Sequence, residues 1–62
     1  METSALPRML TIPESAEYLR SSVKFVRSLI WSRTLPYIRA GKRYVIDRED
    51  IDRWIERTKH IM

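Results

Sequence analysis

The clearest pattern in the chain is an apolar stripe at helical spacing within residues 22–33. At about 100° per residue, one face of this segment holds the apolar side chains, which are Val26, Leu29 and Ile30. The other face holds Lys24, Arg27, Ser28 and Trp31. Ser22 stands where its hydroxyl can accept hydrogen bonds from the free N–H groups of a first turn. The pattern predicts a helix that buries one face and presents a short basic face, which suits either a DNA groove or an ordinary solvated surface.

A shorter helix is predicted just before it, over residues 12–19. Thr11 and Glu14 have capping-box spacing, and Pro13 is tolerated in a first turn because its missing N–H would have no helical partner. The apolar positions that recur on one face are Ile12, Ala16 and Leu19. Two helices joined only through Arg20 and Ser21 must cross steeply, as in a helix-turn-helix. The turn needs a residue with positive φ, and we expect Arg20 to be strained there.

A β-hairpin and a third helix follow. Leu35-Pro36 ends helical geometry, and residues 37–39 and 43–46 are rich in β-branched and aromatic residues around a tight basic tip at 40–42. We expect Ile38, Tyr44 and Ile46 to line the inner face of the hairpin, with Arg39 and Arg43 pointing outward. Asp47 is predicted to cap the third helix. The apolar spacing of this helix is given by Ile51, Trp54, Ile55 and Thr58.

These elements predict one small α+β domain, a winged helix-turn-helix with a two-stranded wing and a C-terminal helix. We place a flexible N-terminal arm at residues 1–8, the domain at 9–58 and a tail at 59–62. The 62 residues leave room for one small core. The chain contains no cysteine, which removes disulfides, thiolate zinc sites and cysteine nucleophiles. Neither a secretory signal nor an apolar run of bilayer length is present, so we expect a cytoplasmic protein without membrane contact.

Charge is segregated along the chain more strongly than the net charge of +4 suggests. Residues 20–46 carry seven basic and no acidic residues, whereas residues 1–19 carry one basic and three acidic residues, and residues 47–62 carry four and five. A basic block of this kind repels itself in a compact domain, so a polyanion is its natural partner. In so short a chain, the clustering could also arise by chance.

In order and spacing, residues 10–56 resemble the excisionase-type helix-turn-helix family, a small relative of the MerR-type DNA-binding domain. The motifs that carry the resemblance are Leu10-Thr11-Ile12 with Glu14-Ser15-Ala16, Leu19 followed by Ser22, Val26 with Leu29-Ile30, Leu35-Pro36, Gly41-Lys42-Arg43-Tyr44 followed by Ile46, Arg48-Glu49-Asp50-Ile51, and Trp54-Ile55. The resemblance implies a winged helix-turn-helix whose second helix enters the major groove and whose wing lies near a minor groove or the backbone.

Carried over by position, the resemblance implies a set of DNA-binding residues. For the major groove these are Ser22, Lys24, Arg27 and Ser28, and for the wing they are Arg39, Lys42 and Arg43. Arg20 and Trp31 are additional candidates. The chain departs from the family pattern at four positions. Arg20 and Arg33 stand where the family commonly has glycine, Val23 stands where it often has arginine, and Trp31 takes a commonly basic position. The target sequence therefore cannot be inferred by analogy.

Trp31 has three possible explanations. It packs on Tyr37 or Leu35 at the start of the wing, it meets the DNA backbone or a neighbouring subunit, or it is simply exposed.

The leading interpretation is sequence-specific binding of double-stranded DNA. Within it, two roles remain. One is an excisionase-like factor, which bends attachment-site DNA, assists an integrase (a site-specific recombinase) and self-associates cooperatively on DNA. The other is a small transcriptional regulator. The alternative of another class is a protein-interaction adaptor that has lost DNA binding. We expect no enzyme, catalytic residue, metal site or cofactor, because His60 lies near a chain end and the carboxylates fall at helix starts.

Overall fold

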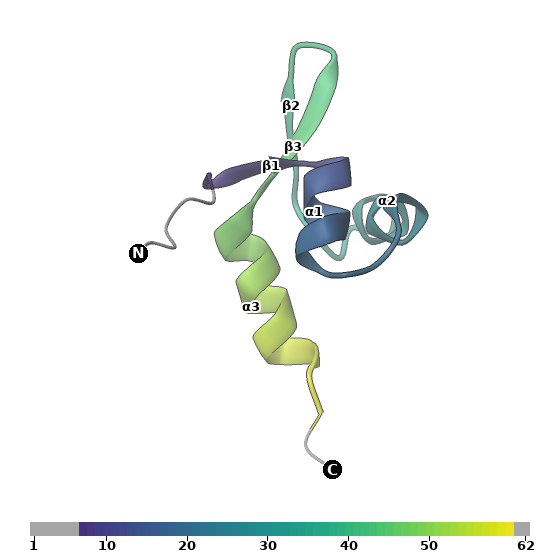
Figure 1. Ribbon diagram of the computed structural model, residues 1–62, viewed down its shortest axis with the longest axis vertical. Coiled ribbons are helices and arrows are strands. Elements are labelled where there is room, and N and C mark those ends of the chain that lie inside the picture. Colours follow the sequence, from purple (N-terminus) through teal and green to yellow (C-terminus); the bar gives the residue numbers. More distant parts are fainter. Residues whose placement is uncertain (1–6, 61–62) are drawn as a thin grey trace.

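The computed structural model describes residues 7–60 and contains three helices and a three-stranded antiparallel sheet within that range (Figure 1). In chain order the elements are β1 (Met9–Thr11), α1 (Ile12–Tyr18), α2 (Val23–Trp31), β2 (Ile38–Ala40), β3 (Arg43–Asp47) and α3 (Arg48–Thr58). The predicted α+β winged helix-turn-helix is confirmed, with β2 and β3 as the wing. Of the predicted arm, residues 1–6 lie outside the described residues, as do residues 61–62 of the predicted tail.

The start of α1 follows the predicted capping box. The Thr11 hydroxyl accepts a hydrogen bond from the Glu14 N–H at 3.3 Å, and the Glu14 carboxylate accepts one from the Thr11 N–H at 2.8 Å. Two N–H groups that have no partner within the helix are thereby satisfied. This cap fixes where the chain turns from β1 into α1.

Strand β1 is the one element of the described chain that the sequence analysis did not predict, because it expected a helix from residue 12 and no strand before it. Residues 9–11 instead pair antiparallel with β3, with Leu10 opposite Ile46. Both side chains are buried, at 2% and 0% exposure. A three-residue strand is too short to show the alternation by which strands are recognised. The sheet order is β1-β3-β2, so β3 lies at its centre.

The register of the wing corrects the expected inner face. Ile38 pairs with Val45, and Arg39 pairs with Tyr44. Residues opposite each other point to the same side of a sheet, so Ile38 lies on the face opposite to Tyr44, and Arg39 lies on the same face as Tyr44. Ile38 is accordingly 50% exposed. The prediction that Ile38 faces inward and Arg39 outward was wrong.

A single core joins all three helices to the sheet. Its buried apolar residues are Leu10, Ile12, Ala16, Val26, Leu29, Ile30, Leu35, Ile46 and Ile51. The buried face predicted for residues 22–33 is therefore confirmed. At the edge of the core, Phe25 of α2 meets Trp54 of α3 edge-on, with ring centroids 6.2 Å apart.

A hydrogen bond also ties α1 to α3. The Tyr18 hydroxyl donates to the Asp52 carboxylate at 2.6 Å. This bond holds the phenol proton and, together with partial burial, raises the pKa of Tyr18.

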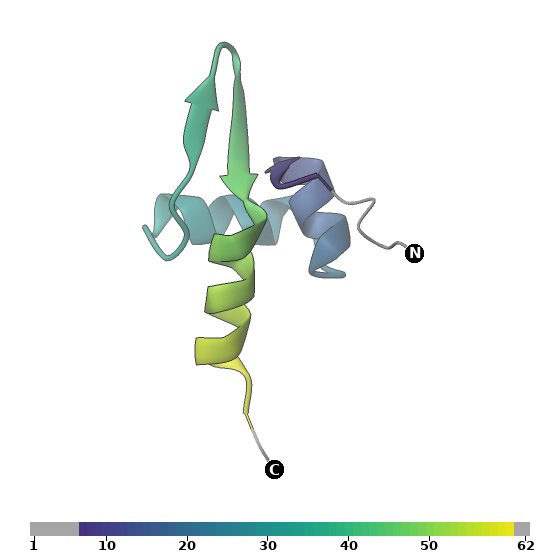
Figure 2. The ribbon, with the colours of Figure 1, turned by 90° about the vertical axis from the view of Figure 1, so that its left-hand side faces the viewer.

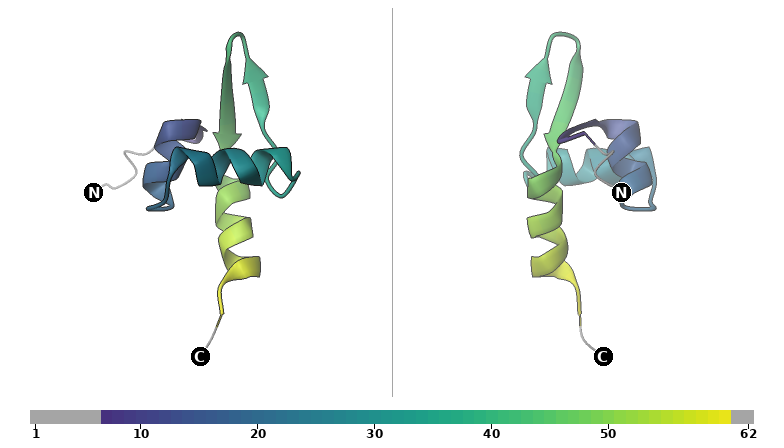
Figure 3. Two further views of the ribbon diagram at one scale, coloured as in Figure 1. Left: turned by 90° about the vertical axis from the view of Figure 1, so that its right-hand side faces the viewer. Right: turned by 60° about the vertical axis from the view of Figure 1, so that its left-hand side comes forward.

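The wing and α3 extend in opposite directions from the body, and α2 crosses between them (Figures 2 and 3). In Figure 1, α2 is seen nearly end-on and lies to one side, with the wing rising above it. The ribbon of α2 and the ribbon of the wing thus meet at an angle.

Candidate nucleic-acid interface

The predicted recognition helix is held by its own cap and by its buried stripe. Ser22 is the N-cap, and its hydroxyl accepts a hydrogen bond from the Phe25 N–H at 3.1 Å. The exposed side of the helix carries Lys24 and Arg27, neither of which forms an ion pair with another residue in the range 7–60. Two cationic side chains therefore project from a rigidly anchored helix.

The two serines of the predicted site make bonds within the helix. The Ser28 hydroxyl donates to the Phe25 carbonyl at 2.6 Å, while Ser22 accepts from the N–H of the same residue. Ser22 keeps a proton to donate to an outside partner, and Ser28 keeps lone pairs to accept with. The two hydroxyls therefore differ in what they can offer a ligand.

Each of the two helices of the helix-turn-helix is followed by an arginine in left-handed conformation. Arg20 has φ 56° and Arg33 has φ 62°. Each follows a helix that ends in a Schellman motif. After α1, the Arg20 and Ser21 N–H groups donate to Glu17 and Ala16. After α2, the corresponding bonds run from Arg33 to Ile30 and from Thr34 to Leu29. The expected strain at Arg20 is confirmed, and Arg33 repeats it.

The wing turns tightly at Gly41, whose φ is 66°. Arg39 is held within the wing, because its guanidinium lies over the Tyr44 ring at 5.9 Å and its Nε donates to the Gly41 carbonyl at 3.4 Å. Lys42 and Arg43 are exposed at the tip. Of the three wing cations predicted for the site, these two have no such contact within the described chain.

A surface hollow brings α2 and the wing together. It is lined by Thr11, Ile12, Pro13, Arg27, Lys42, Arg43 and Tyr44. Arg27 from α2 thus borders the same space as Lys42 and Arg43 from the wing, and no acidic residue lines it. The start of α1, which the sequence analysis did not assign to the site, completes the hollow. Its capping box was recognisable in the sequence, but its place beside the wing depends on the pairing of β1 with β3.

Trp31 contacts the wing through a residue that was not foreseen. The Trp31 ring meets the Tyr44 ring edge-on, with centroids 6.1 Å apart. The Tyr37 ring also meets the Tyr44 ring edge-on, with centroids 5.1 Å apart. The expected partner was Tyr37 or Leu35, whereas the observed ring contacts of Trp31 and of Tyr37 are both with Tyr44. Trp31 still exposes 60% of its surface. Packing and exposure are therefore both true of this residue.

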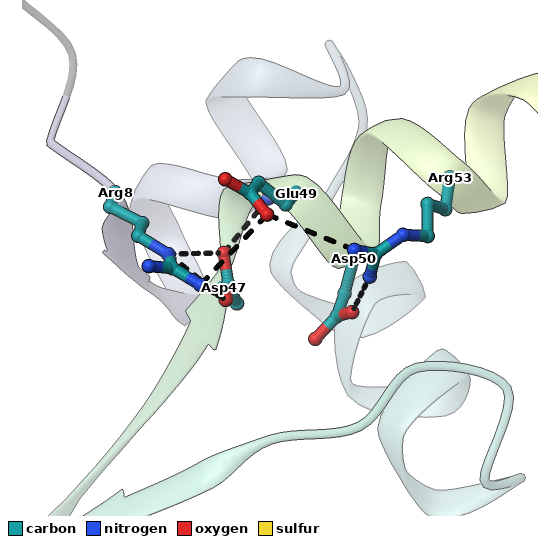
Figure 4. Close-up of polar contacts among 5 residues, drawn as sticks. All are labelled: Arg8, Asp47, Glu49, Asp50 and Arg53. Atoms are coloured by element: carbon teal, nitrogen blue, oxygen red, sulfur yellow. Dashed lines mark hydrogen bonds and ion pairs between the residues drawn. The ribbon is translucent and has the colours of Figure 1, made fainter.

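The ion pairs of the described chain lie away from this basic surface. Arg8 binds Asp47 at 2.9 Å, Arg53 binds Asp50 at 2.8 Å, and Glu49 lies between the two pairs (Figure 4). The Arg8 guanidinium and the Glu49 N–H hold the pKa of Asp47 below its ordinary value, and Asp47 raises the pKa of Arg8. None of the seven bases between residues 20 and 46 has an ion-pair partner within residues 7–60.

The arrangement is that of a helix-turn-helix with a wing beside its second helix, and comparison with protein families agrees. A family model described as a helix-turn-helix domain matches residues 9–59. The chain belongs to the helix-turn-helix domain family. Membership implies that this helix-turn-helix binds double-stranded DNA. Comparisons with curated proteins and with solved structures gave no match.

Among residues 7–60, no group of three or more histidine, cysteine, aspartate or glutamate residues is arranged to hold a metal ion. In the same range, no helix is long and apolar enough to cross a membrane.

Proposed function

We propose that this helix-turn-helix places α2 in the major groove and rests its wing on the neighbouring backbone or minor groove. The observation that carries the proposal is the hollow bordered by Arg27, Lys42 and Arg43, three cations from two elements with no acid among them. Phosphate contacts from lysine and arginine supply most of the affinity for duplex DNA, and base contacts in the groove supply specificity.

The proposal assigns different roles to the basic residues. Lys24 and Arg27 contact base edges, because they project from the helix that enters the groove. Lys42 and Arg43 contact phosphates, and Arg20 adds a phosphate contact at the turn. Arg39 contributes charge from within the wing, where Tyr44 holds it.

The serines have supporting roles in the same scheme. Ser22 caps α2 and can donate its remaining proton to a phosphate. Ser28 can accept a hydrogen bond at a base edge.

Within this function we favour an excisionase-like factor, which binds and bends attachment-site DNA in the cytoplasm and assists an integrase. Support comes from the resemblance of residues 10–56 to that family. Such a factor would bind neighbouring sites cooperatively. A small transcriptional regulator of the same fold, bound at one operator, is the competing role. A DNA-free adaptor is the outcome if duplex binding fails.

The test is a salt titration of duplex binding with paired variants. Four to six phosphate contacts predict a log–log slope of roughly −4 to −5, since each contributes about −0.9. Lys24→Ala and Arg27→Ala should relax sequence preference by about 1–3 kcal/mol per good base contact. Lys42→Ala and Arg43→Ala should weaken all sequences alike and make the slope shallower.

Arg57→Gln on α3 is the matched control, because it removes an exposed charge far from the proposed surface and should leave slope and preference unchanged. Affinity and preference are measured by site selection followed by titration at several salt concentrations. A slope near zero, or no binding at low salt, would contradict the proposal.

A further inference from the structure

A second hollow lies at the C-terminal end of α2, where the chain leaves the helix for the wing. It is lined by Ile30, Trp31, Arg33, Leu35, Pro36 and Tyr37. Ile30 and Leu35 are buried, at 2% and 1% exposure, and form an apolar floor. Trp31 and Tyr37 are 60% and 45% exposed and form its rim with Arg33. No acidic residue lines the hollow.

Arg33 occupies a position that glycine would fill with less strain. Its φ of 62° lies in the left-handed region, which residues with a Cβ adopt at a cost. Its guanidinium forms no hydrogen bond or ion pair with any residue of the described range. The Arg33 side chain therefore makes no polar contact that stabilises the described fold, and its charge lies at the rim of the hollow.

Two aromatic side chains are held in place beside it. The rings of Trp31 and Tyr37 both pack edge-on against Tyr44, with interplanar angles of 89° and 88°. Neither the indole N–H nor the Tyr37 hydroxyl has a hydrogen-bond partner among residues 7–60. The rim thus offers a guanidinium, an N–H and an O–H donor around an apolar floor.

This set of groups suits a strand of sugar and phosphate. Phosphate oxygens accept hydrogen bonds and carry charge, and the carbon face of deoxyribose can lie on an apolar surface. Trp31 follows Arg27 by one helical turn, so the hollow continues the exposed basic face of α2. The nine residues of α2 span about 14 Å, close to the roughly 12 Å width of the major groove. With α2 lying across the groove, groups just beyond the helix end would reach the strand that borders it.

We propose that this hollow binds the sugar–phosphate backbone bordering the major groove, with Arg33, Trp31 and Tyr37 donating to phosphate oxygens. The inference rests on the proposed function, since it requires α2 to enter the groove. A second copy of the chain is a less suitable occupant. On α3, Glu49, Asp50 and Glu56 already pair with arginine or lysine of the same chain, whereas the donors of the hollow require free acceptors.

The test compares three variants on a duplex that holds a single copy. Arg33→Gly removes one phosphate contact and should lower affinity roughly eightfold at about 0.1 M salt, with the slope shallower by about 0.9. Its thermal stability should not fall, because glycine relieves the left-handed strain. Trp31→Phe keeps a ring but loses the N–H, and should weaken binding roughly 2- to 10-fold. Arg57→Gln is the charge control and should leave the slope unchanged.

A direct readout accompanies the affinities. Acrylamide quenching of Trp31, obtained as the difference between wild type and Trp31→Phe, should decrease when duplex binds. If wild type binds with the expected salt dependence but Arg33→Gly keeps the full slope and Trp31 stays equally quenched, the hollow is not a backbone site. If the variants lose only cooperativity on a longer duplex, the hollow binds a second copy and the inference is overturned. Failure of the wild type to bind duplex refutes the proposed function itself.

Discussion

Ser15 is fully buried on α1, and its hydroxyl oxygen has no hydrogen-bond partner in the described structure. A small side chain at this position leaves room for the core, as Ala16 does beside it. Burying a hydroxyl without a partner costs free energy, because its bonds to water are lost and not replaced. Size, rather than polarity, explains why a residue like serine fits here.

Ser15→Ala should therefore stabilise the domain. Removing the unsatisfied hydroxyl and improving helix propensity should together raise the free energy of unfolding by about 1–2 kcal/mol. Urea denaturation followed by circular dichroism measures the change. Ala16→Ser, which adds a hydroxyl at an adjacent buried position, is the matched control and should lower stability. A less stable Ser15→Ala protein would mean that the hydroxyl has a partner, such as a buried water molecule.

Single residues were predictable where local geometry alone decides them. The left-handed turn at Arg20 follows from the short connection between two helices, and the cap at Ser22 follows from hydroxyl chemistry. The ring partner of Trp31 was not predictable in this way. It depends on which wing residue faces α2, and that choice is set by strand register.

At the scale of elements, Asp47 joins the sheet to α3. It ends β3 and accepts a hydrogen bond from the Glu49 N–H at 2.9 Å as the cap of α3. Its two carboxylate oxygens also accept from the Arg8 Nε–H, each at 3.2 Å, and one of them accepts from Arg8 Nη2 at 2.9 Å. The Arg48 N–H donates to the Arg8 carbonyl at 2.8 Å. One carboxylate therefore fixes both the entry to β1 and the start of α3.

Stability should fall in acid partly because of this carboxylate. The folded state holds the pKa of Asp47 below its ordinary value of 3.8. Its contribution is thus present above the ordinary pKa and is lost as pH falls through the lower pKa of the folded state. Asp47→Asn keeps a good capping residue but removes the charge, so its stability should depend less on pH in that window. Thermal melts from about pH 5 to about pH 2 measure this. Glu17→Gln, at an exposed position without an ion pair in the described range, should keep the pH dependence of the wild type.

The longer helices were predictable from sequence, whereas β1 was missed and β2 was predicted with the wrong face. Residues 23–31 and 48–58 carry apolar stripes over several turns, and both helices appear where the stripes predict them. β1 and β2 have three residues each, too few to fix a face from alternation. A shift of one residue in such a strand exchanges its two faces. This explains why the expected orientations of Ile38 and Arg39 differ from the observed ones.

At the scale of the whole molecule, paired and unpaired charges lie largely on different elements. Three acids of α3, Glu49, Asp50 and Glu56, pair with Arg8, Arg53 and Lys59. The bases of α2 and the wing have no ion pairs in the described range. A compact body with cations on both a helix and a projecting wing can contact DNA at two separated places. A duplex that bends toward the protein can make both sets of contacts, and their binding free energy offsets the energy of bending.

Bending separates the architectural role from simple regulation. An excisionase-like factor should bind several neighbouring sites and bend them, and smooth bending of a short site by tens of degrees costs about 1–6 kcal/mol. Circular-permutation mobility shifts on attachment-site DNA measure the bend. Lys42→Ala with Arg43→Ala should reduce it, because the wing would then hold the flanking backbone less firmly. An unbent complex at a single isolated operator would favour the regulator.

The pairing of β1 with β3 has a consequence for how the chain folds. α1 packs on α2, and β2 on β3, between neighbours in sequence, so these units can form with little loss of loop entropy. β1, in contrast, must find its partner at the far end of the domain, where Leu10 meets Ile46. Closing that long loop is the entropically expensive step. We therefore expect the pairing of this three-residue strand at the edge of the sheet to be one of the steps that slow the folding of the domain.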